Sequence, residues 1–296
     1  IARELRATRV LITSDAGVVR AGHTAAAIGS LASAHLAATV FSEFGENPTT
    51  AQVNAGTAAA RQFGPDLIVG LGGGSSMDCA KGINFILSCG GRMHDYHGRG
   101  KATGPMLPSI AVPTTAGTGS ETQSFALITD ADTGMKMACG DPRAAFRVAI
   151  LDVTLTLTQP PRVAALTGID AVSHAIESHV CRAATPASRI FSREAWRLLS
   201  HNLPRVFADG GDVAARQAVQ LGAAWAGLAA GLTALARAEL VLILPIAALA
   251  LLLRRSDDPP RRRWAAAGAL LGAGVLVMAP WVVRNLVTFE RPVGLS

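Results

Sequence analysis

Asp170 and His174 stand four residues apart in a segment whose pattern is helical. On a helix, residues i and i+4 lie on one face, so this carboxylate and this imidazole can bind one cation together. A divalent metal takes about four ligands from protein and water, and the chain has no histidine after His201. The spacing therefore predicts one part of a metal site. The sequence does not supply the other imidazoles that would complete it.

A run of glycine and serine at 72–75 follows the apolar segment 66–71, which is typical of a buried strand. Glycine lets a backbone approach a phosphate closely. The helix expected to begin near Ser75 directs free N–H groups and its positive dipole end toward an anion. The run favours a phosphate-binding loop over a plain strand-to-helix turn, but it lacks the G-x-G-x-x-G spacing of the generic dinucleotide fingerprint.

A second loop, 113–121, is rich in threonine and glycine and follows the expected strand 109–112. Its hydroxyls and amides can bind a nucleotide, and the alternative is a polar surface loop. Two such loops at strand ends in one sheet line one crevice, where α/β folds bind ligands. Asp15 ends the first expected strand, where a carboxylate can bind the ribose hydroxyls of adenosine and repel a 2′-phosphate; otherwise it is a turn or cap residue.

Strand and helix patterns alternate over residues 1–160, the region that carries both loops. We expect strands at 9–15, 37–41, 66–71, 109–112 and 149–152, with helices at 20–35 and 49–63. This alternation predicts a Rossmann-like α/β domain with a parallel sheet. From 161 to 230 the pattern is helical only, which predicts a truncated all-α domain after Pro160 and Pro161.

The composition restricts the class of protein. Half of the 296 residues are hydrophobic, and much of the net charge of +6 comes from 231–296, which contains eight arginines and four acidic residues. These arginines flank apolar runs without forming a basic stripe with aromatics, which argues against a nucleic-acid partner. The four cysteines form no C-x-x-C pair and fit reduced cytoplasmic thiols. The first residues do not resemble a signal peptide and lack an initial methionine, so we expect a fragment.

Residues 1 to about 230 resemble the iron-containing, or group III, alcohol dehydrogenases. The matching motifs occur in family order: NPT at 47–49, GGGSSMD at 72–78 with Lys81, PTTAGTGSE at 113–121, Lys136, and GIDAVSHAIE at 168–177. The resemblance implies a dinucleotide-binding α/β domain, a helical domain, and a metal in the cleft between them. It further implies a cytoplasmic enzyme that transfers hydride between NAD and a small alcohol or aldehyde.

The resemblance also implies roles for particular residues. Asp170 and His174 would bind Fe²⁺, or Zn²⁺ in some relatives. The metal polarises the alcohol oxygen and lowers the alcohol's pKa, so that hydride can leave for the nicotinamide. No catalytic side chain is assigned. The residues that would contact NAD are Asp15, Asn47, Gly73, Gly74, Ser75, Ser76, Met77, Asp78, Thr114, Thr115, Thr118 and Lys136.

The family requires two further metal-binding histidines after position 230, and the chain has none there. We therefore expect an incomplete metal site and impaired alcohol dehydrogenase activity. The alternative is a catalytically dead fusion or fragment. A homo-oligomer is compatible with the sequence.

The region 231–296 has a different character. Residues 240–253 and 264–283 are two apolar runs separated by an arginine-rich loop at 254–263. A helix of about 20 apolar residues spans a bilayer, so the pattern predicts a transmembrane hairpin, with a buried hairpin in a soluble protein as the alternative. The region weakly resembles integral-membrane glycosyltransferases that use polyprenyl-phosphate sugars, in which case the function would lie in this tail.

The charges of the hairpin conflict with the dehydrogenase resemblance. The positive-inside rule places the loop 254–263 in the cytoplasm, which would put the dehydrogenase-like part on the other side, away from the NAD pool. Either the loop breaks this rule, or the hairpin does not span a membrane, or the tail was joined to an unrelated part. We expect the last, a fusion or an artefact joined near 221–235. The dehydrogenase-like part would be cytoplasmic, and the chain would be membrane-associated only if the tail is genuine.

Overall fold

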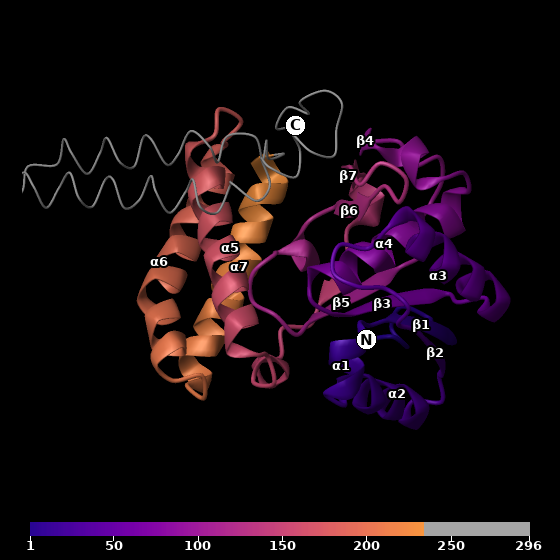
Figure 1. Ribbon diagram of the computed structural model, residues 1–296, viewed down its shortest axis with the longest axis horizontal. Helices are drawn as coiled ribbons and strands as arrows, with labels where there is room; N and C mark the ends of the chain where they lie inside the picture. The colour runs from indigo at the N-terminus through magenta and orange to yellow at the C-terminus, as the bar shows by residue number, and fades with distance from the viewer. Residues whose placement is uncertain (234–296) are drawn as a thin grey trace, which may run out of the picture. The chain divides into compact units, whose positions relative to one another are not determined.

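A parallel sheet forms the centre of the N-terminal region in the computed structural model, which describes residues 1–233 (Figure 1). Its strands are β1 (Arg9–Thr13), β2 (Ala37–Phe41), β3 (Leu67–Gly72), β5 (Ser109–Pro113) and β8 (Val148–Ala149). Their order is β2-β1-β3-β5-β8, and each neighbouring pair is parallel. The predicted parallel α/β arrangement is confirmed, although the strand predicted at 149–152 is the two-residue β8, which shares only Ala149 with it.

Helices pack on both faces of this sheet because side chains alternate between the faces along each strand. Leu11 of β1 belongs to the core cluster that contains Val53 of α3 (Thr50–Phe63) and Ile83 of α4 (Gly74–Cys89). Val10 and Ile12 belong to a second cluster, which includes part of α2 (His23–Ser33). All of β3 is buried, as expected for a central parallel strand covered on both faces.

The helix expected at 20–35 is two helices. The structure has α1 (Ala16–Arg20) and α2, separated by Ala21 and Gly22. Asp15 caps α1 by accepting hydrogen bonds from the first-turn amides, which satisfies donors that have no helical partner. The helix expected at 49–63 is confirmed as α3, which begins with a capping box between Thr49 and Gln52.

A second, smaller sheet was not expected from the sequence. It consists of β4 (Gly98–Arg99), β7 (Lys136–Gly140) and β6 (Phe125–Thr129), in that order, with β6 and β7 antiparallel. The turn between β6 and β7 is held by Asp130, which accepts hydrogen bonds from the amide of Asp132 and the hydroxyl of Thr133. Short 3-10 helices cover Met93–Tyr96 (η1), Ser120–Thr122 (η2), Pro142–Ala144 (η3) and Val153–Thr156 (η4).

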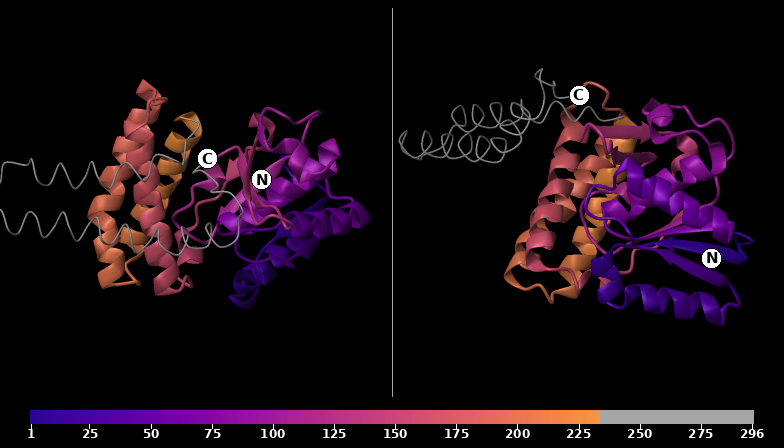
Figure 2. Two further views of the ribbon diagram at one scale, coloured as in Figure 1. Left: turned by 45° about the horizontal axis from the view of Figure 1, so that its top comes forward. Right: turned by 45° about the vertical axis from the view of Figure 1, so that its right-hand side comes forward.

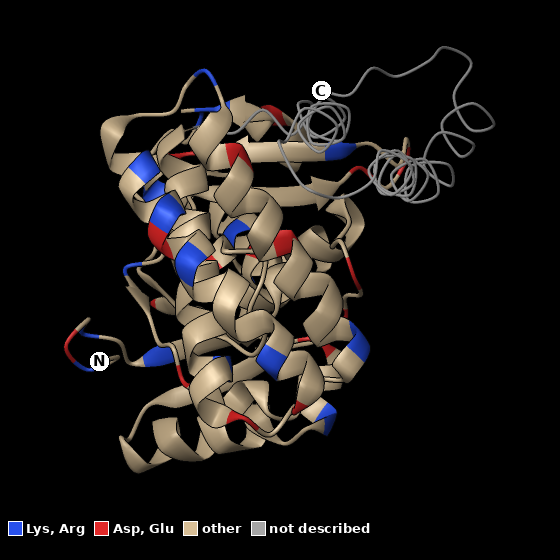
Figure 3. Cartoon of the chain, turned by 90° about the vertical axis from the view of Figure 1, so that its left-hand side faces the viewer, with Lys and Arg blue, Asp and Glu red and all other residues tan. Residues whose placement is uncertain are grey.

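From 161 onward the described chain is helical, as predicted. The helices are α5 (Pro161–Val180), α6 (Pro186–Ala208) and α7 (Val213–Thr233), and they lie side by side (Figure 2). Alanine and leucine side chains form their common core, which includes Ala171, Leu199 and Ala223. The charged side chains lie mainly on the outer faces of these helices (Figure 3).

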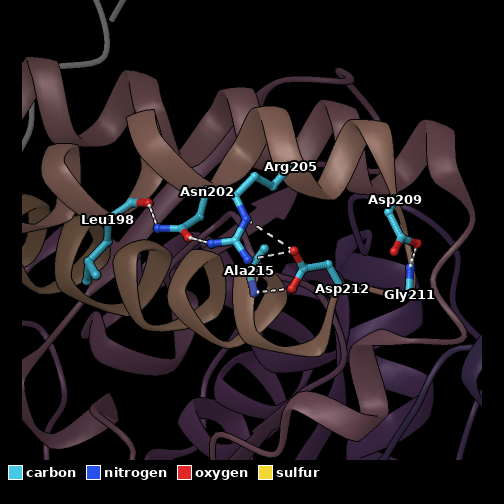
Figure 4. A network of polar contacts seen from close by, with 7 residues as sticks. All are labelled: Leu198, Asn202, Arg205, Asp209, Gly211, Asp212 and Ala215. Carbon is cyan, nitrogen blue, oxygen red and sulfur yellow. Dashed lines mark hydrogen bonds and ion pairs between the residues drawn. The ribbon is translucent and has the colours of Figure 1, made fainter.

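The turn between α6 and α7 is held by a polar network (Figure 4). Arg205 of α6 donates two hydrogen bonds to Asp212, at 3.1 and 2.7 Å, and the other carboxylate oxygen of Asp212 accepts from the amide of Ala215. Asp212 therefore caps the start of α7 and pairs with the end of α6. Arg205 also donates to Asn202, and Asp209 accepts from the amide of Gly211.

Within residues 1–233, no helix is both long enough and apolar enough to cross a membrane. The expected hairpin, with its apolar runs at 240–253 and 264–283, lies outside the described residues.

Candidate cofactor and metal site

The first candidate loop joins β3 to α4. β3 ends at Gly72 and α4 begins at Gly74, with Gly73 as the N-cap residue and no side chain bonded to the cap. The first backbone N–H groups of a helix have no partner within it, and together with the helix dipole they attract an anion. The loop therefore has the backbone geometry of a phosphate site.

The second loop lies directly beside the first. Gly72 of β3 pairs in register with Pro113 of β5, and the amide of Thr114 donates to the carbonyl of Gly72 at 2.9 Å. A side chain at Gly74 would lie 2.8 Å from the side chain of Thr118, so the Thr118 side chain packs against the backbone of the glycine loop. The prediction that the loops face each other at one end of the sheet is confirmed.

Asp15 lies beside the glycine loop. Its Oδ1 accepts from the amides of Gly17 and Val18 at the start of α1, and its Oδ2 accepts from the hydroxyl of Ser76 at 3.3 Å. A side chain at Gly72 would meet the hydroxyl of Ser76 at 2.3 Å and Oδ2 of Asp15 at 3.2 Å. Asp15 is therefore a cap residue of α1 whose carboxylate also lies beside the glycine loop.

Asn47 connects two candidate residues that are distant in the sequence. Its backbone N–H donates to the hydroxyl of Ser75 at 3.2 Å, and its Oδ1 accepts from Nζ of Lys136 at 2.7 Å. Asn47 has a φ of 53°, a left-handed conformation that asparagine tolerates better than most residues. Asn47 and Lys136 are exposed and Ser75 is half-buried, so this cluster is accessible to a ligand.

The remaining candidates differ in how accessible they are. Ser76, Met77 and Asp78 are buried behind the glycine loop, and Asp78 accepts a hydrogen bond from the hydroxyl of Ser120 at 2.8 Å. Thr114 is also buried. The half-buried candidates are Gly73, Thr115 and Thr118, whereas Gly74 is buried.

The predicted metal ligands lie on one face of α5. Nε2 of His174 is 3.8 Å from Oδ1 of Asp170, within reach of one ion placed between them at bonds of about 2.1 Å. Asp170 is 46 % exposed and His174 only 5 %, so the open side of such a site lies at the carboxylate. Among residues 1–233, no group of three or more histidine, cysteine, aspartate or glutamate side chains could hold a metal ion. Asp170 and His174 thus fit a metal ion as two of its ligands, with further ligands required to complete the site.

A buried group of charges lies under the second loop. Burial raises the pKa of Glu121 to about 7, although the charge of Lys81 acts in the opposite direction. Burial lowers the pKa of Lys81 to about 8, against the attraction of Asp78 and Glu121. Both residues fall within motifs recognised in the sequence, but their charges were given no role there. The sequence did carry a signal for this group. Lys81 falls in an otherwise largely apolar helix, and Glu121 falls at the end of a glycine-rich loop.

The fold and the two facing loops are those of an α/β protein with a parallel sheet, followed by a helical region. Comparison with known proteins narrows this class. Residues 1–153 match the family model described as iron-containing alcohol dehydrogenase, and 164–238 match the model of the C-terminal region of the Fe-containing alcohol dehydrogenase family. The chain therefore belongs to the iron-containing alcohol dehydrogenase family, whose members use NAD and iron or another divalent metal.

Curated relatives include the NAD-dependent methanol dehydrogenase of Bacillus methanolicus, which is 37 % identical over 227 residues, 77 % of this chain and 60 % of that protein. The 1,3-propanediol dehydrogenase of Klebsiella pneumoniae is 32 % identical over 223 residues, covering 75 % of this chain and 58 % of the relative. The chain thus spans about 60 % of the length of the relatives it matches.

Solved structures agree with this assignment. An alcohol dehydrogenase from Oenococcus oeni matches with a TM-score of 0.77 and 27 % identity, covering 84 % of this chain and 64 % of that one. The sulfoacetaldehyde reductase of Bifidobacterium kashiwanohense, solved in complex with NAD⁺, matches with a TM-score of 0.74 and 28 % identity, covering 94 % and 71 % of the two chains.

The comparisons also bear on the expected fusion. The C-terminal family model extends to residue 238, past the whole of 221–235, where the sequence analysis expected two unrelated parts to join. Neither the fusion nor the glycosyltransferase resemblance is supported.

Proposed function

We propose that this chain binds NAD in the crevice between the loops 72–78 and 113–121 and serves metal-dependent hydride transfer between a small alcohol and its aldehyde. The observation that carries the proposal is the close approach of these two loops, at the N-terminus of α4 and the end of β5. An anionic pyrophosphate matches the uncapped helix start. Because the chain spans only part of its relatives' length, the activity of the whole protein belongs to this proposal.

The cofactor contacts in this proposal come from three places. The amides of Gly73, Gly74 and Ser75 face the phosphates, and the hydroxyls of Thr115 and Thr118 close the crevice from the opposite side. Lys136, held by Asn47, supplies a positive charge beside the phosphates. Asp15 accepts hydrogen bonds from the adenosine ribose. Ser76, Met77, Asp78 and Thr114 support the two loops from inside.

The metal contacts come from Asp170 and His174. A bound iron or zinc ion would polarise the alcohol oxygen and lower the alcohol's pKa. His174, being buried, holds its imidazole in place on α5, while the exposed Asp170 leaves space for substrate. Substrates are small alcohols or aldehydes in this proposal, as the names of the relatives suggest for those proteins.

Asp15 is expected to make the chain prefer NADH over NADPH. Asp15→Asn keeps an oxygen that can accept from the amides of Gly17 and Val18, but it removes the negative charge. We expect NADPH to bind more tightly to Asp15→Asn than to the native chain, because repulsion of the 2′-phosphate is lost, with little change in melting temperature. Fluorescence titration with both cofactors measures this.

The same titration tests the proposed function itself. A native chain that gives no saturable NADH signal contradicts cofactor binding in the crevice. An unchanged ratio of NADH to NADPH affinity in Asp15→Asn, with NADH still bound, contradicts only the role of Asp15.

We expect impaired catalysis, because Asp170 and His174 are the two donors identified and no histidine follows His201. The purified chain should hold clearly less than one equivalent of iron or zinc and produce almost no NADH from a simple alcohol. Elemental analysis and an absorbance assay at 340 nm (the NADH band) measure both quantities. One tightly held metal per chain, together with alcohol-dependent NADH production, would contradict the expected loss of activity. The chain would then be a complete enzyme.

A second candidate function is NAD binding without turnover, which the count of two donors favours. NADH binding without metal or activity supports it. In either case we propose three regions, 1–160, 161–230 and 231–296. The dehydrogenase-like part would lie in the cytoplasm, where NAD is available. Homo-oligomer formation, membrane association through 240–283 and a function located in the tail have no support in the described residues.

A further inference from the structure

Lys81 lies inside α4, two turns after the glycine loop, and only 2 % of it is exposed. None of the proposed cofactor or metal contacts uses it. An ammonium group is costly to bury unless it is paired and hydrogen-bonded. The partners of Lys81 therefore indicate why a lysine occupies this position.

Those partners come from one segment. Nζ of Lys81 donates to the carbonyl of Ser120 at 2.7 Å, to the hydroxyl of Ser120 at 2.9 Å and to the carbonyl of Phe125 at 2.8 Å. An ammonium group has three N–H donors and no acceptor, so these three bonds match its charged form. The hydroxyl of Ser120 donates in turn to Asp78, which leaves its lone pairs to accept from Lys81.

Three neighbouring groups oppose the cost of burying this positive charge. Asp78 of α4 and Glu121 of η2 both attract it. The ring of Phe146 lies 5.1 Å from Nζ, within the range of a cation–π contact. Charged hydrogen bonds and a facing aromatic ring compensate in part for the loss of water around the ammonium group.

The segment held by Lys81 begins at the far end of the loop 113–121. The hydroxyl of Thr118 accepts from the amide of Ser120 at 3.3 Å, and Thr118 lies against Gly74. At its N-terminus α4 carries the glycine loop, and two turns later it binds the 120–125 segment through Lys81. One helix thus sets the positions of both sides of the crevice.

We propose that Lys81 is a positioning residue for the cofactor crevice. Its ammonium group bonds Ser120 and Phe125 and thereby holds the loop 113–121 over the glycine loop. The consequence for NAD rests on the proposed function, whereas the position of the loop is a property of the free chain. The two can therefore be measured separately.

The test in the free chain is amide hydrogen exchange of peptides covering 113–123, with peptides covering β1 as an internal reference. Lys81→Met removes the charge and all three donors, and we expect exchange in 113–123 to accelerate by at least about tenfold relative to β1. Ile83→Val is the matched control, because Ile83 is buried in the same helix but lies against Gly56 and the α3 side of the core. Ile83→Val should leave the ratio of the exchange rate in 113–123 to that in β1 unchanged.

Two further variants keep the test decisive if Lys81→Met does not fold. Ser120→Ala removes the hydroxyl that links Lys81 to Asp78, and it should accelerate exchange in 113–123. Ser88→Ala removes a hydroxyl from the same helix that bonds Asn84 and Leu107 instead, and it should not. Lys81→Arg keeps a charge and N–H donors, and its exchange should be closer to native than that of Lys81→Met.

NADH titration of the same variants supplies the second readout. The dissociation constant should rise in Lys81→Met and Ser120→Ala and stay unchanged in Ile83→Val and Ser88→Ala. Equal exchange in 113–123 for Lys81→Met and Ile83→Val, or for Ser120→Ala and Ser88→Ala, overturns the positioning role. If the loop responds as expected but the native chain does not bind NADH, the proposed function fails and the positioning role stands.

Discussion

Gly227→Ala is expected to lower the stability of the chain by about 2 kcal/mol. A side chain at Gly227 of α7 would lie 2.5 Å from both the Cα and the carbonyl oxygen of Gly119, which are backbone atoms that cannot rotate away. Gly119 itself has a φ of 62° and belongs to the loop 113–121. The added methyl group must therefore displace either the helix or the loop, and urea unfolding measures the cost as a lower midpoint.

Gly231→Ala is the matched control for this prediction. Gly231 lies one turn later on the same helix, and a side chain there would be 3.7 Å from its nearest neighbour, the carbonyl oxygen of Thr122, an ordinary contact distance. Alanine inside a helix is favoured over glycine by about 1 kcal/mol, so this variant should be as stable as the native chain or more so. Equal midpoints for the two variants contradict a backbone contact between α7 and the loop.

Gly72→Ala is expected to weaken NADH binding by at least about tenfold, because the glycine loop must move away from its native position to relieve two costs of roughly 1–3 kcal/mol each. The φ of Gly72 is 145°, a conformation that residues with a side chain rarely adopt. The new methyl group would also lie 2.3 Å from the hydroxyl of Ser76 and 3.2 Å from the carboxylate of Asp15. Isothermal titration with NADH measures the loss.

Gly90→Ala separates the two costs. Gly90 follows α4 with a φ of 78°, and nothing lies within 4 Å of a side chain placed there. It therefore carries backbone strain without a collision and lies at the opposite end of the helix from the crevice. We expect a lower melting temperature with unchanged NADH affinity, so a comparable loss of affinity in both variants would show that general destabilisation explains the result.

The features that the sequence predicted correctly depend on neighbours a few residues apart. The strand predicted at 66–71 before a glycine run, the helix predicted at 49–63, and the i, i+4 pair on α5 are all set by local spacing. The second sheet was missed because β4 has only two residues and because β6 and β7 are joined by the polar turn 130–135, whose composition resembles a surface loop.

The amino-acid sequence by itself determined the alternating α/β pattern, the two loops and the carboxylate–imidazole pair, because periodicity and turn chemistry act over a few residues. Only the tertiary structure decided that Gly72 lies in register with Pro113, that Lys136 bonds Asn47 across 89 residues, and that Lys81 is buried under Ser120. These pairs meet because the chain closes long loops around a common core, so their contacts depend on the packing of every element between them.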